Sequence, residues 1–183
     1  MPRAGLDAAT VVAAGAALAD EVGFAGLTMG LLAERLGVRT PSLYKHIAGQ
    51  EDLNRRIAAR ALDEAAAAIG TAIQGYAGRD ALAAAARAFR DYVLAHPGRY
   101  AATVGMTADD ALRASGDRAL DALRAVLRAY PIRPENVDHA LRTVRSLLHG
   151  FATLQAANGF QWSADVDRSF EWLIDFADRG LRS

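Results

Sequence analysis

Six polar residues between positions 39 and 46 carry groups that bind nucleic acids: Arg39, Thr40, Ser42, Tyr44, Lys45 and His46. Guanidinium, ammonium, hydroxyl and imidazole groups donate hydrogen bonds to phosphate oxygens and to base edges. Residues 28–60 hold six Lys or Arg against three Asp or Glu, a local charge of +3, whereas the whole chain has a net charge of 0. This modest positive segment indicates an anionic partner.

The same stretch has the pattern of two short helices that cross at a tight turn. Ala33 is small enough for a second helix to pass close to the first, and Gly37, four positions later, tolerates a positive φ. Apolar residues at suitable spacing would brace both helices: Leu32, Leu36, Val38 and Leu43. This pattern predicts a helix-turn-helix whose second helix exposes the polar residues. The alternative is an ordinary pair of packed helices with a polar outer face.

Helix caps, breaks and apolar periodicity predict an all-α chain with about nine helices and no strand. The 42 alanines favour helix and disfavour strand. Asp7, Thr28 and Ser163 are predicted helix caps, and Thr40 is predicted to cap a helix with Pro41 in its first turn. The expected helices cover residues 7–22, 29–36, 41–47, 50–73, 80–95, 99–106, 109–129, 135–158 and 163–179. We expect an N-terminal three-helix domain at 1–49 and a helical body at 50–183.

The last two predicted helices are apolar over wide stripes. A helix that is apolar nearly all round must be buried on two sides, and the body of its own subunit can cover one of them. A second copy of the chain, forming a four-helix bundle, would cover the other. The alternative is a central core helix in a monomer. The expected dimer interface contains Val144, Leu148, Phe151, Phe170, Leu173, Ile174 and Ala177.

Residues 7–53 resemble the DNA-binding domain of TetR-family transcriptional regulators. The resemblance rests on Phe24, on Leu32-Ala33, and on residues 37–47, where Gly-Val is followed by Pro-Ser-Leu-Tyr-Lys-His-Ile. The body is similar more weakly, through Leu-His-Gly-Phe at 148–151, to the His-Gly signature of one large subgroup. The resemblance implies a dimeric regulator, usually a repressor, that binds a palindromic operator in double-stranded DNA. A small-molecule inducer that enters the C-terminal body would release it; an activator is the other reading.

The resemblance also implies roles for single residues. Base edges would be contacted by Arg39, Thr40, Pro41 and Ser42. Phosphates would be contacted by Thr28, Tyr44 and His46, with Lys45 at the rim and Gln50 at the start of the next helix. Two positions depart from the family pattern, since Gly30 gives up a base contact and Gln50 gives up a positive charge. These losses imply modest affinity and a larger role for Arg39.

An inducer pocket would be apolar with a few polar anchors. The candidates in the body are Phe89, Tyr92, Tyr100, Arg145, His149 and Trp162. The aromatic residues could instead be core. Arg145 could be a snorkelling or intersubunit arginine, and His149 could be a core or interface histidine.

Catalytic and metal chemistry has little support in the sequence. There is no cysteine, and no two of the four histidines have metal-ligand spacing. Asp138, His139 and Ser146 come without a nucleophile elbow. We therefore expect no enzyme, no metal and no cofactor. The rival hypothesis is an all-α enzyme or small-molecule-binding protein whose N-terminal helices are only structural.

Membrane association is not expected either. No apolar run approaches the ~18 residues of a membrane span. The N-terminal segment does not have the pattern of a signal peptide. The sequence therefore predicts a cytoplasmic protein.

Overall fold

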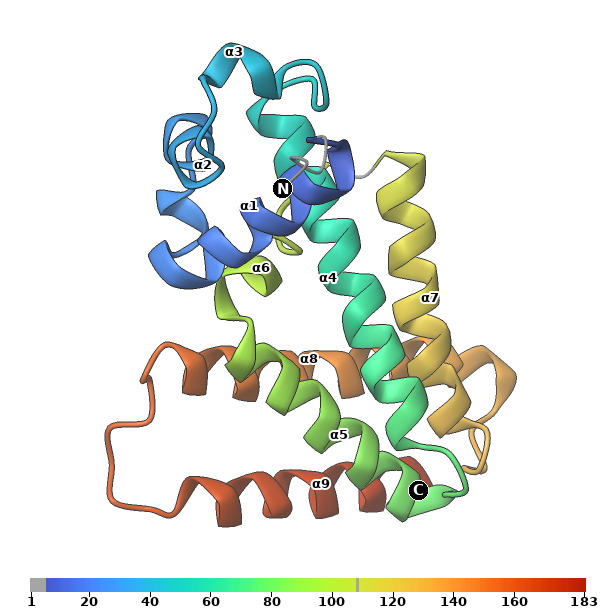
Figure 1. The fold of residues 1–183 in the computed structure, drawn as a ribbon. Helices are drawn as coiled ribbons and strands as arrows, with labels where there is room; N and C mark the ends of the chain where they lie inside the picture. Colours follow the sequence, from blue (N-terminus) through green and yellow to red (C-terminus); the bar gives the residue numbers. More distant parts are fainter. Residues whose placement is uncertain (1–5, 108) are drawn as a thin grey trace. The chain divides into compact units, whose positions relative to one another are not determined.

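The computed structural model describes residues 6–107 and 109–183, and within them the chain forms nine α-helices, two 3₁₀ helices and no strand (Figure 1). The all-α prediction is confirmed. The chain divides into two compact units. The first extends to Leu62 and also contains His96–Ser115, and the second contains Asp63–Ala95 and Gly116–Ser183. The predicted functional boundary after residue 49 stays a prediction.

The first unit opens with α1 (Ala8–Val22), which begins and ends where the sequence predicts. The Asp7 carboxylate accepts a hydrogen bond from the backbone N–H of Thr10 at 2.7 Å, which satisfies one of the free donors of the first turn. Gly23 ends the helix at φ +80°, a conformation that other residues rarely adopt. The 3₁₀ helix η1 (Phe24–Gly26) follows directly.

The next two helices form the predicted helix-turn-helix. Thr28 caps α2 (Met29–Arg35) by accepting a hydrogen bond from Leu31 N at 3.2 Å. Gly37 has φ +64°, as the tight turn requires. The helix predicted at 41–47 is shorter in the structure, where α3 covers only Thr40–Leu43. Its cap position is Arg39, so the prediction that Thr40 is the cap was wrong by one residue.

The chain beyond α3 keeps a helix-like backbone contact without continuing the helix. Ile47 N still donates to Leu43 O at 3.1 Å, but His46 N donates to the same oxygen at 2.9 Å, which closes a turn. The α-helix therefore ends at Leu43 and not near Ile47. The long helix α4 (Gln50–Ala72) then begins as predicted and runs through the boundary between the units.

The first unit is completed by α6 (Pro97–Ala101) and by the start of α7 (Asp110–Leu127). The sequence predicted the α6 helix at 99–106. The predicted start is two residues too late, because Pro97 can occupy the first turn of a helix, and the predicted end is five residues too late. The unit has one hydrophobic core. Its fully buried members include Val11, Ala16, Leu32, Leu43, Leu53 and Ile57.

The second unit is built from the rest of α4 and α7 together with α5 (Gly78–Ala95), α8 (Val137–Ala156) and α9 (Val166–Arg182). The 3₁₀ helix η2 (Pro134–Asn136) leads into α8. Within the unit, α5 packs against both α8 and α9 (Figure 1). The predicted cap Ser163 was wrong: Asp165 caps α9 by accepting from Arg168 N at 2.7 Å, since a carboxylate is favoured at a helix N-terminus.

Candidate DNA-binding surface and dimerisation face

The helix-turn-helix turns its apolar residues inward and leaves its polar residues accessible. Leu32, Ala33, Leu43 and Ile47 are buried in the core of the first unit. Arg39, Pro41, Tyr44 and Lys45 are exposed, whereas Thr40, Ser42 and His46 are half-buried. The aromatic side chain of Tyr44 is 56% exposed, although its ring is largely apolar. The predicted DNA contacts therefore lie at the surface, along α3 and the turn that follows it.

Ion pairing separates the cations near this surface into two groups. Arg35 is paired with Glu21, Arg55 with Glu51, and Arg56 with Asp52. Arg39 and Lys45, by contrast, make no ion pair within the described part of the chain. Lys45 is also the only lysine in the sequence. These two side chains are the cations with charge available for an anionic partner.

The start of α4 is already engaged by side chains of the same unit. The Asp52 carboxylate accepts a hydrogen bond from Ala48 N at 2.8 Å. The half-buried Gln50 donates its amide to Asn54 Oδ1, also at 2.8 Å. Two acidic residues, Glu51 and Asp52, stand in the first turn. Gln50 would have to release Asn54 to contact a phosphate, so its DNA-binding role stays a prediction.

The six predicted pocket residues do not share one environment. Phe89 and Tyr92 are buried on α5, and Tyr92 donates its hydroxyl to Glu64 Oε2 at 2.9 Å. His149 is half-buried, and burial, with a smaller contribution from nearby Arg145, lowers the pKa of its imidazole.

The remaining pocket candidates are divided between surface and core. Arg145 and Trp162 are exposed, with Trp162 at 69%. Tyr100 is buried in the first unit, whereas the other five candidates belong to the second. The set thus supplies buried aromatic rings and a half-buried imidazole, and its role in ligand binding is a proposal.

The predicted dimer residues lie mainly in the chain's own core. Phe170 and Ile174 are 1% and 0% exposed. Val144, Leu148 and Ala177 are also buried, and Phe151 and Leu173 are half-buried. A fully buried side chain has no surface left for a second copy. The apolar stripe that the sequence shows on α9 therefore packs inward in this single chain.

A second apolar face remains open on α8 and α9. It carries three exposed large residues, Leu154, Trp172 and Phe176, at 51%, 65% and 51%. Trp172 and Phe176 stack with their ring centroids 5.7 Å apart. A groove of about 300 Å³ between the two helices is lined by Ala140, Thr143, Val144, Leu147, Phe176, Ala177, Gly180 and Leu181. We call this surface the α8–α9 face.

Sequence reasoning missed Trp172 and Phe176 although a signal was present. They stand four apart and fall two positions after Phe170 and Ile174, so α9 has two apolar stripes on different sides. Only one stripe can face the unit's own core. A count of both stripes would have identified the second as the surface available to a partner.

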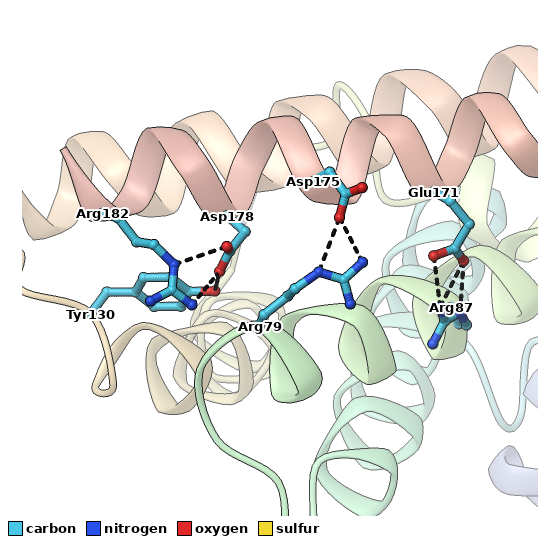
Figure 2. Close-up of polar contacts among 7 residues, drawn as sticks. All are labelled: Arg79, Arg87, Tyr130, Glu171, Asp175, Asp178 and Arg182. Carbon is cyan, nitrogen blue, oxygen red and sulfur yellow. Dashed lines mark hydrogen bonds and ion pairs between the residues drawn. The ribbon is translucent and has the colours of Figure 1, made fainter.

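A row of ion pairs joins α5 and α9 (Figure 2). Arg79 binds Asp175 at 2.6 Å, and Arg87 binds Glu171 at 2.7 Å. Arg90 continues the row on the same helix by binding Asp167 at 2.6 Å. The acids recur every four residues, so they lie on one side of α9. Exposed ion pairs contribute little stability, so the orientation of α9 depends mainly on the burial of Phe170 and Ile174.

A buried polar cluster secures the C-terminal end of α9 (Figure 2). Tyr130 donates its hydroxyl to Asp178 Oδ1 at 2.7 Å, and Arg182 donates to both oxygens of the same carboxylate. The hydrogen bond from Arg182 is the main cause that lowers the pKa of Asp178; burial opposes it, and the bond from Tyr130 adds to it. Burial and the bond to Asp178 raise the pKa of Tyr130. Asp178 is thus held as a carboxylate.

Asp178→Asn is expected to lower the free energy of unfolding by about 1–2 kcal/mol at neutral pH, because a charge-assisted hydrogen bond is lost. A carboxyl group whose pKa falls on folding stabilises the protein fully above its unfolded pKa of about 4 and loses this effect as the pH falls further. The difference between variant and wild type should therefore shrink in acid. Urea unfolding at a fixed protein concentration, at several pH values, measures it.

Asp175→Asn is the matched control, since it removes a carboxylate of the same helix that is 43% exposed. Its expected effect is below about 1 kcal/mol. An equal loss of stability in both variants would show that burial of the Tyr130–Asp178–Arg182 cluster has no special weight.

No metal-binding group of three or more His, Asp or Glu side chains occurs in the part of the chain that the structure describes. None of the described helices has the length and hydropathy needed to span a membrane.

Two family models match this chain. The model described as bacterial regulatory proteins, tetR family, matches residues 11–57, which contain the helix-turn-helix. The model described as Tetracyclin repressor-like, C-terminal domain, matches residues 82–177, which contain all of α8 and most of α5 and α9. The two matches correspond to the DNA-binding surface and to the helices that carry the α8–α9 face.

Individual relatives match over nearly the whole chain. YobS of Bacillus subtilis (strain 168), an uncharacterized HTH-type transcriptional regulator, is 30% identical over 174 residues, which cover 94% of this chain and 91% of YobS. The crystal structure of BioQ with its natural double-stranded DNA operator is 29% identical, with a TM-score of 0.72 and coverage of 98% and 99%. A TetR variant from Acinetobacter baumannii AYE in complex with minocycline is 28% identical, with a TM-score of 0.73 and the same coverage.

Proposed function

Because this chain belongs to the TetR family of bacterial transcriptional regulators, we propose that it is a ligand-responsive repressor that binds a palindromic operator as a homodimer. The observation that carries the proposal is the accessible helix-turn-helix, where Arg39 and Lys45 are exposed and without an ion pair inside the described chain. A helix-turn-helix places its second helix in the major groove, and a two-fold dimer reads two related half-sites. BioQ, a relative, was crystallised with its operator.

Within this proposal the exposed residues have different tasks. Arg39 stands at the start of α3, where a guanidinium can bind a base edge with two hydrogen bonds. Tyr44 and Lys45 lie in the turn after α3 and contact phosphates, which position the protein without reading sequence. Thr40, Pro41 and Ser42 lie between these groups, close to the bases, while Thr28 and His46 contact phosphates at the edge of the site.

Arg39→Ala is expected to relax the base preference at one position of each half-site by about 1–3 kcal/mol. Tyr44→Phe and Lys45→Ala are expected to weaken binding to all sequences by similar factors, because phosphates are the same in every sequence. The measurement is a selection of bound sequences from a random DNA pool with each purified variant. Glu34→Ala, an exposed change on α2, serves as the control. An unaltered preferred sequence for Arg39→Ala would contradict its role, and failure of the wild type to select any sequence would contradict the proposed function.

The α8–α9 face supports the homodimer. Gly180 lines its groove, and apart from the backbone of its own helix nothing lies within 4 Å of the position that a Cβ would take there. Small residues of this kind let two helices approach closely, and large ones fill the spaces beside them. Two copies related by a two-fold axis would bury the same face on each other, as four packed helices.

The proposed inducer would bind in the second unit, near Phe89, Tyr92 and His149. Their buried rings and half-buried imidazole have the mixed apolar and polar character of small-molecule sites. The family's C-terminal domain model covers all three positions, and one relative was crystallised with minocycline. An inducer can release DNA only if it binds the DNA-free state more tightly, so operator must weaken inducer binding by the same factor.

A further inference from the structure

We propose that the two-fold axis of the homodimer passes beside Leu147 of α8 and Phe176 of α9, and that Leu154 and Trp172 of each copy pack on the hollow end of the other copy's α8–α9 face. This pairing rests on the proposed function, which requires a homodimer on that face. It goes further, because it states which residues meet across the interface. All four residues belong to the second unit.

The α8–α9 face is uneven along its length. Helices α8 and α9 run antiparallel and are joined at one end by residues 157–165 (Figure 1). Nearer to that end stand two large exposed side chains, Leu154 at 51% and Trp172 at 65%. Toward the other end lies the groove of about 300 Å³, whose lining includes the small residues Ala140 and Gly180. One end of the face therefore protrudes and the other end is hollow.

A two-fold axis makes such a face complementary to itself. In an interface of this symmetry, residue i of one copy meets residue j of the other, and j meets i. Rotation about an axis that lies in the face and crosses both helices places each protruding end on the partner's hollow end. Leu154 then enters the groove beside the partner's Ala140. Trp172 packs over the partner's Gly180, where a side chain is missing and the space is open.

The two helices agree on where this axis lies. On α8, the residue midway between the protruding leucine and the small groove residue is Leu147. On α9, the residue midway between the protruding tryptophan and the groove glycine is Phe176. Leu147 and Phe176 line the same groove, so they lie at the same level of the face. A single axis beside them therefore satisfies both pairings at once, and a shifted axis would move a protruding side chain off its hollow.

The position of the axis determines which residues come close to their own copies. Phe176 lies beside the axis, so its two copies face each other across the interface. Leu154 stands seven residues from Leu147, which is about 10 Å along the helix at 1.5 Å per residue. Its two copies are therefore about 20 Å apart, well beyond the roughly 7 Å between Cα atoms that a disulfide can span. Both side chains are 51% exposed in the single chain, so random collisions would treat them alike.

The test is disulfide cross-linking of single-cysteine variants of the full-length chain, which has no cysteine of its own. Under mild oxidation, Phe176→Cys is expected to form a covalent dimer about tenfold faster or more than Leu154→Cys, because proximity in the dimer raises the effective thiol concentration. Non-reducing electrophoresis measures both rates, after light scattering has confirmed that each variant is a dimer. Leu147→Cys, also beside the axis, replaces Phe176→Cys if that variant dissociates.

A double variant tests the pairing of the protruding and hollow ends directly. Leu154→Cys combined with Ala140→Cys is expected to cross-link rapidly, because each thiol then lies beside the other thiol of the partner. The same two positions are fourteen residues apart on one helix, about 21 Å, so they cannot react within one chain. Ala140→Cys alone should stay as slow as Leu154→Cys alone.

Equal rates for Phe176→Cys and Leu154→Cys would overturn this pairing, since random collisions would then explain both. Rapid cross-linking of Leu154→Cys alone would also overturn it, because the axis would then lie near the joined end of the two helices. In both cases a wild-type chain with the mass of a dimer leaves the proposed function intact. A wild-type chain that is monomeric by light scattering would instead contradict the homodimer of the proposed function, and the pairing with it.

Discussion

Phe176→Glu is expected to convert the dimer into a monomer at micromolar concentration while the helix content stays nearly unchanged. Phe176 is 51% exposed in the single chain, so the monomer tolerates a charge there. In the proposed dimer the same position is buried against the partner, where an unpaired charge costs about 3–5 kcal/mol. A two-fold interface contains the change twice, so the dissociation constant should rise by roughly 10⁴-fold or more. Light scattering with circular dichroism measures both properties.

Two further variants give this result its meaning. Phe170→Glu places the charge six residues earlier on α9, at a position that is 1% exposed in the chain's own core, and it should destroy the fold itself. Val104→Glu alters a residue of the first unit that is 56% exposed and should leave the mass of the dimer unchanged. If Phe176→Glu still has the mass of a dimer by light scattering, the α8–α9 face is not the interface. The monomeric variant should also lose operator binding, because the helix-turn-helix of one chain contacts only one half-site.

DNA binding is expected to weaken by about 12- to 150-fold when the salt concentration rises from 50 to 200 mM. Lys45 supplies two phosphate contacts per dimer, and Arg39 adds up to two more positive charges. At about 0.9 counterions released per contact, the slope of log K against log salt lies between about −1.8 and −3.6. The paired Arg35, Arg55 and Arg56 add nothing in this account, because carboxylates already neutralise them. Fluorescence anisotropy with a selected operator gives the slope.

The variant series separates the free cations from the paired ones. Lys45→Ala should reduce the slope by about 1.8, because each dimer loses two phosphate contacts. Arg56→Ala, which breaks the pair with Asp52, should leave the slope almost unchanged. A wild-type slope steeper than about −6 would show that the paired arginines leave their carboxylates to bind phosphate. In that case the low free charge of this surface would not set its affinity.

Local sequence signals correctly predicted the first helices and the tight turn of the helix-turn-helix. Asp7 and Thr28 cap helices as expected, because a short side-chain oxygen before an apolar-periodic run has one favourable partner, the free N–H groups of the first turn. Gly37 holds the positive φ that the turn needs. The errors at Thr40 and Ser163 are shifts of one and two residues, and sequence signals locate the end of a helix only to within one or two residues.

The features that sequence reasoning could not give depend on contacts between distant segments. Phe170 and Trp172 are both large and apolar, and only packing against α5 distinguishes them: Phe170 is 1% exposed with Arg90 of α5 over its ring, whereas Trp172 is 65% exposed. Gly98 looks like an ordinary helix-start glycine until the backbone of Ala19 is seen beside it. In both cases the deciding partner lies about 80 or more residues away in the chain, beyond the reach of periodicity or capping rules.

The single lysine of this chain has a consequence for chemistry in solution. Lys45 is exposed in the turn after α3, and every other Lys or Arg position in the sequence is an arginine. Acetylation acts on ε-amines and removes their charge, whereas guanidinium groups keep theirs. An acyl donor that reacts with ε-amines would therefore change the charge of this protein only at its proposed DNA contact. The same selectivity makes Lys45 a unique ε-amine for attaching one fluorophore per chain, beside the groove that the operator would occupy.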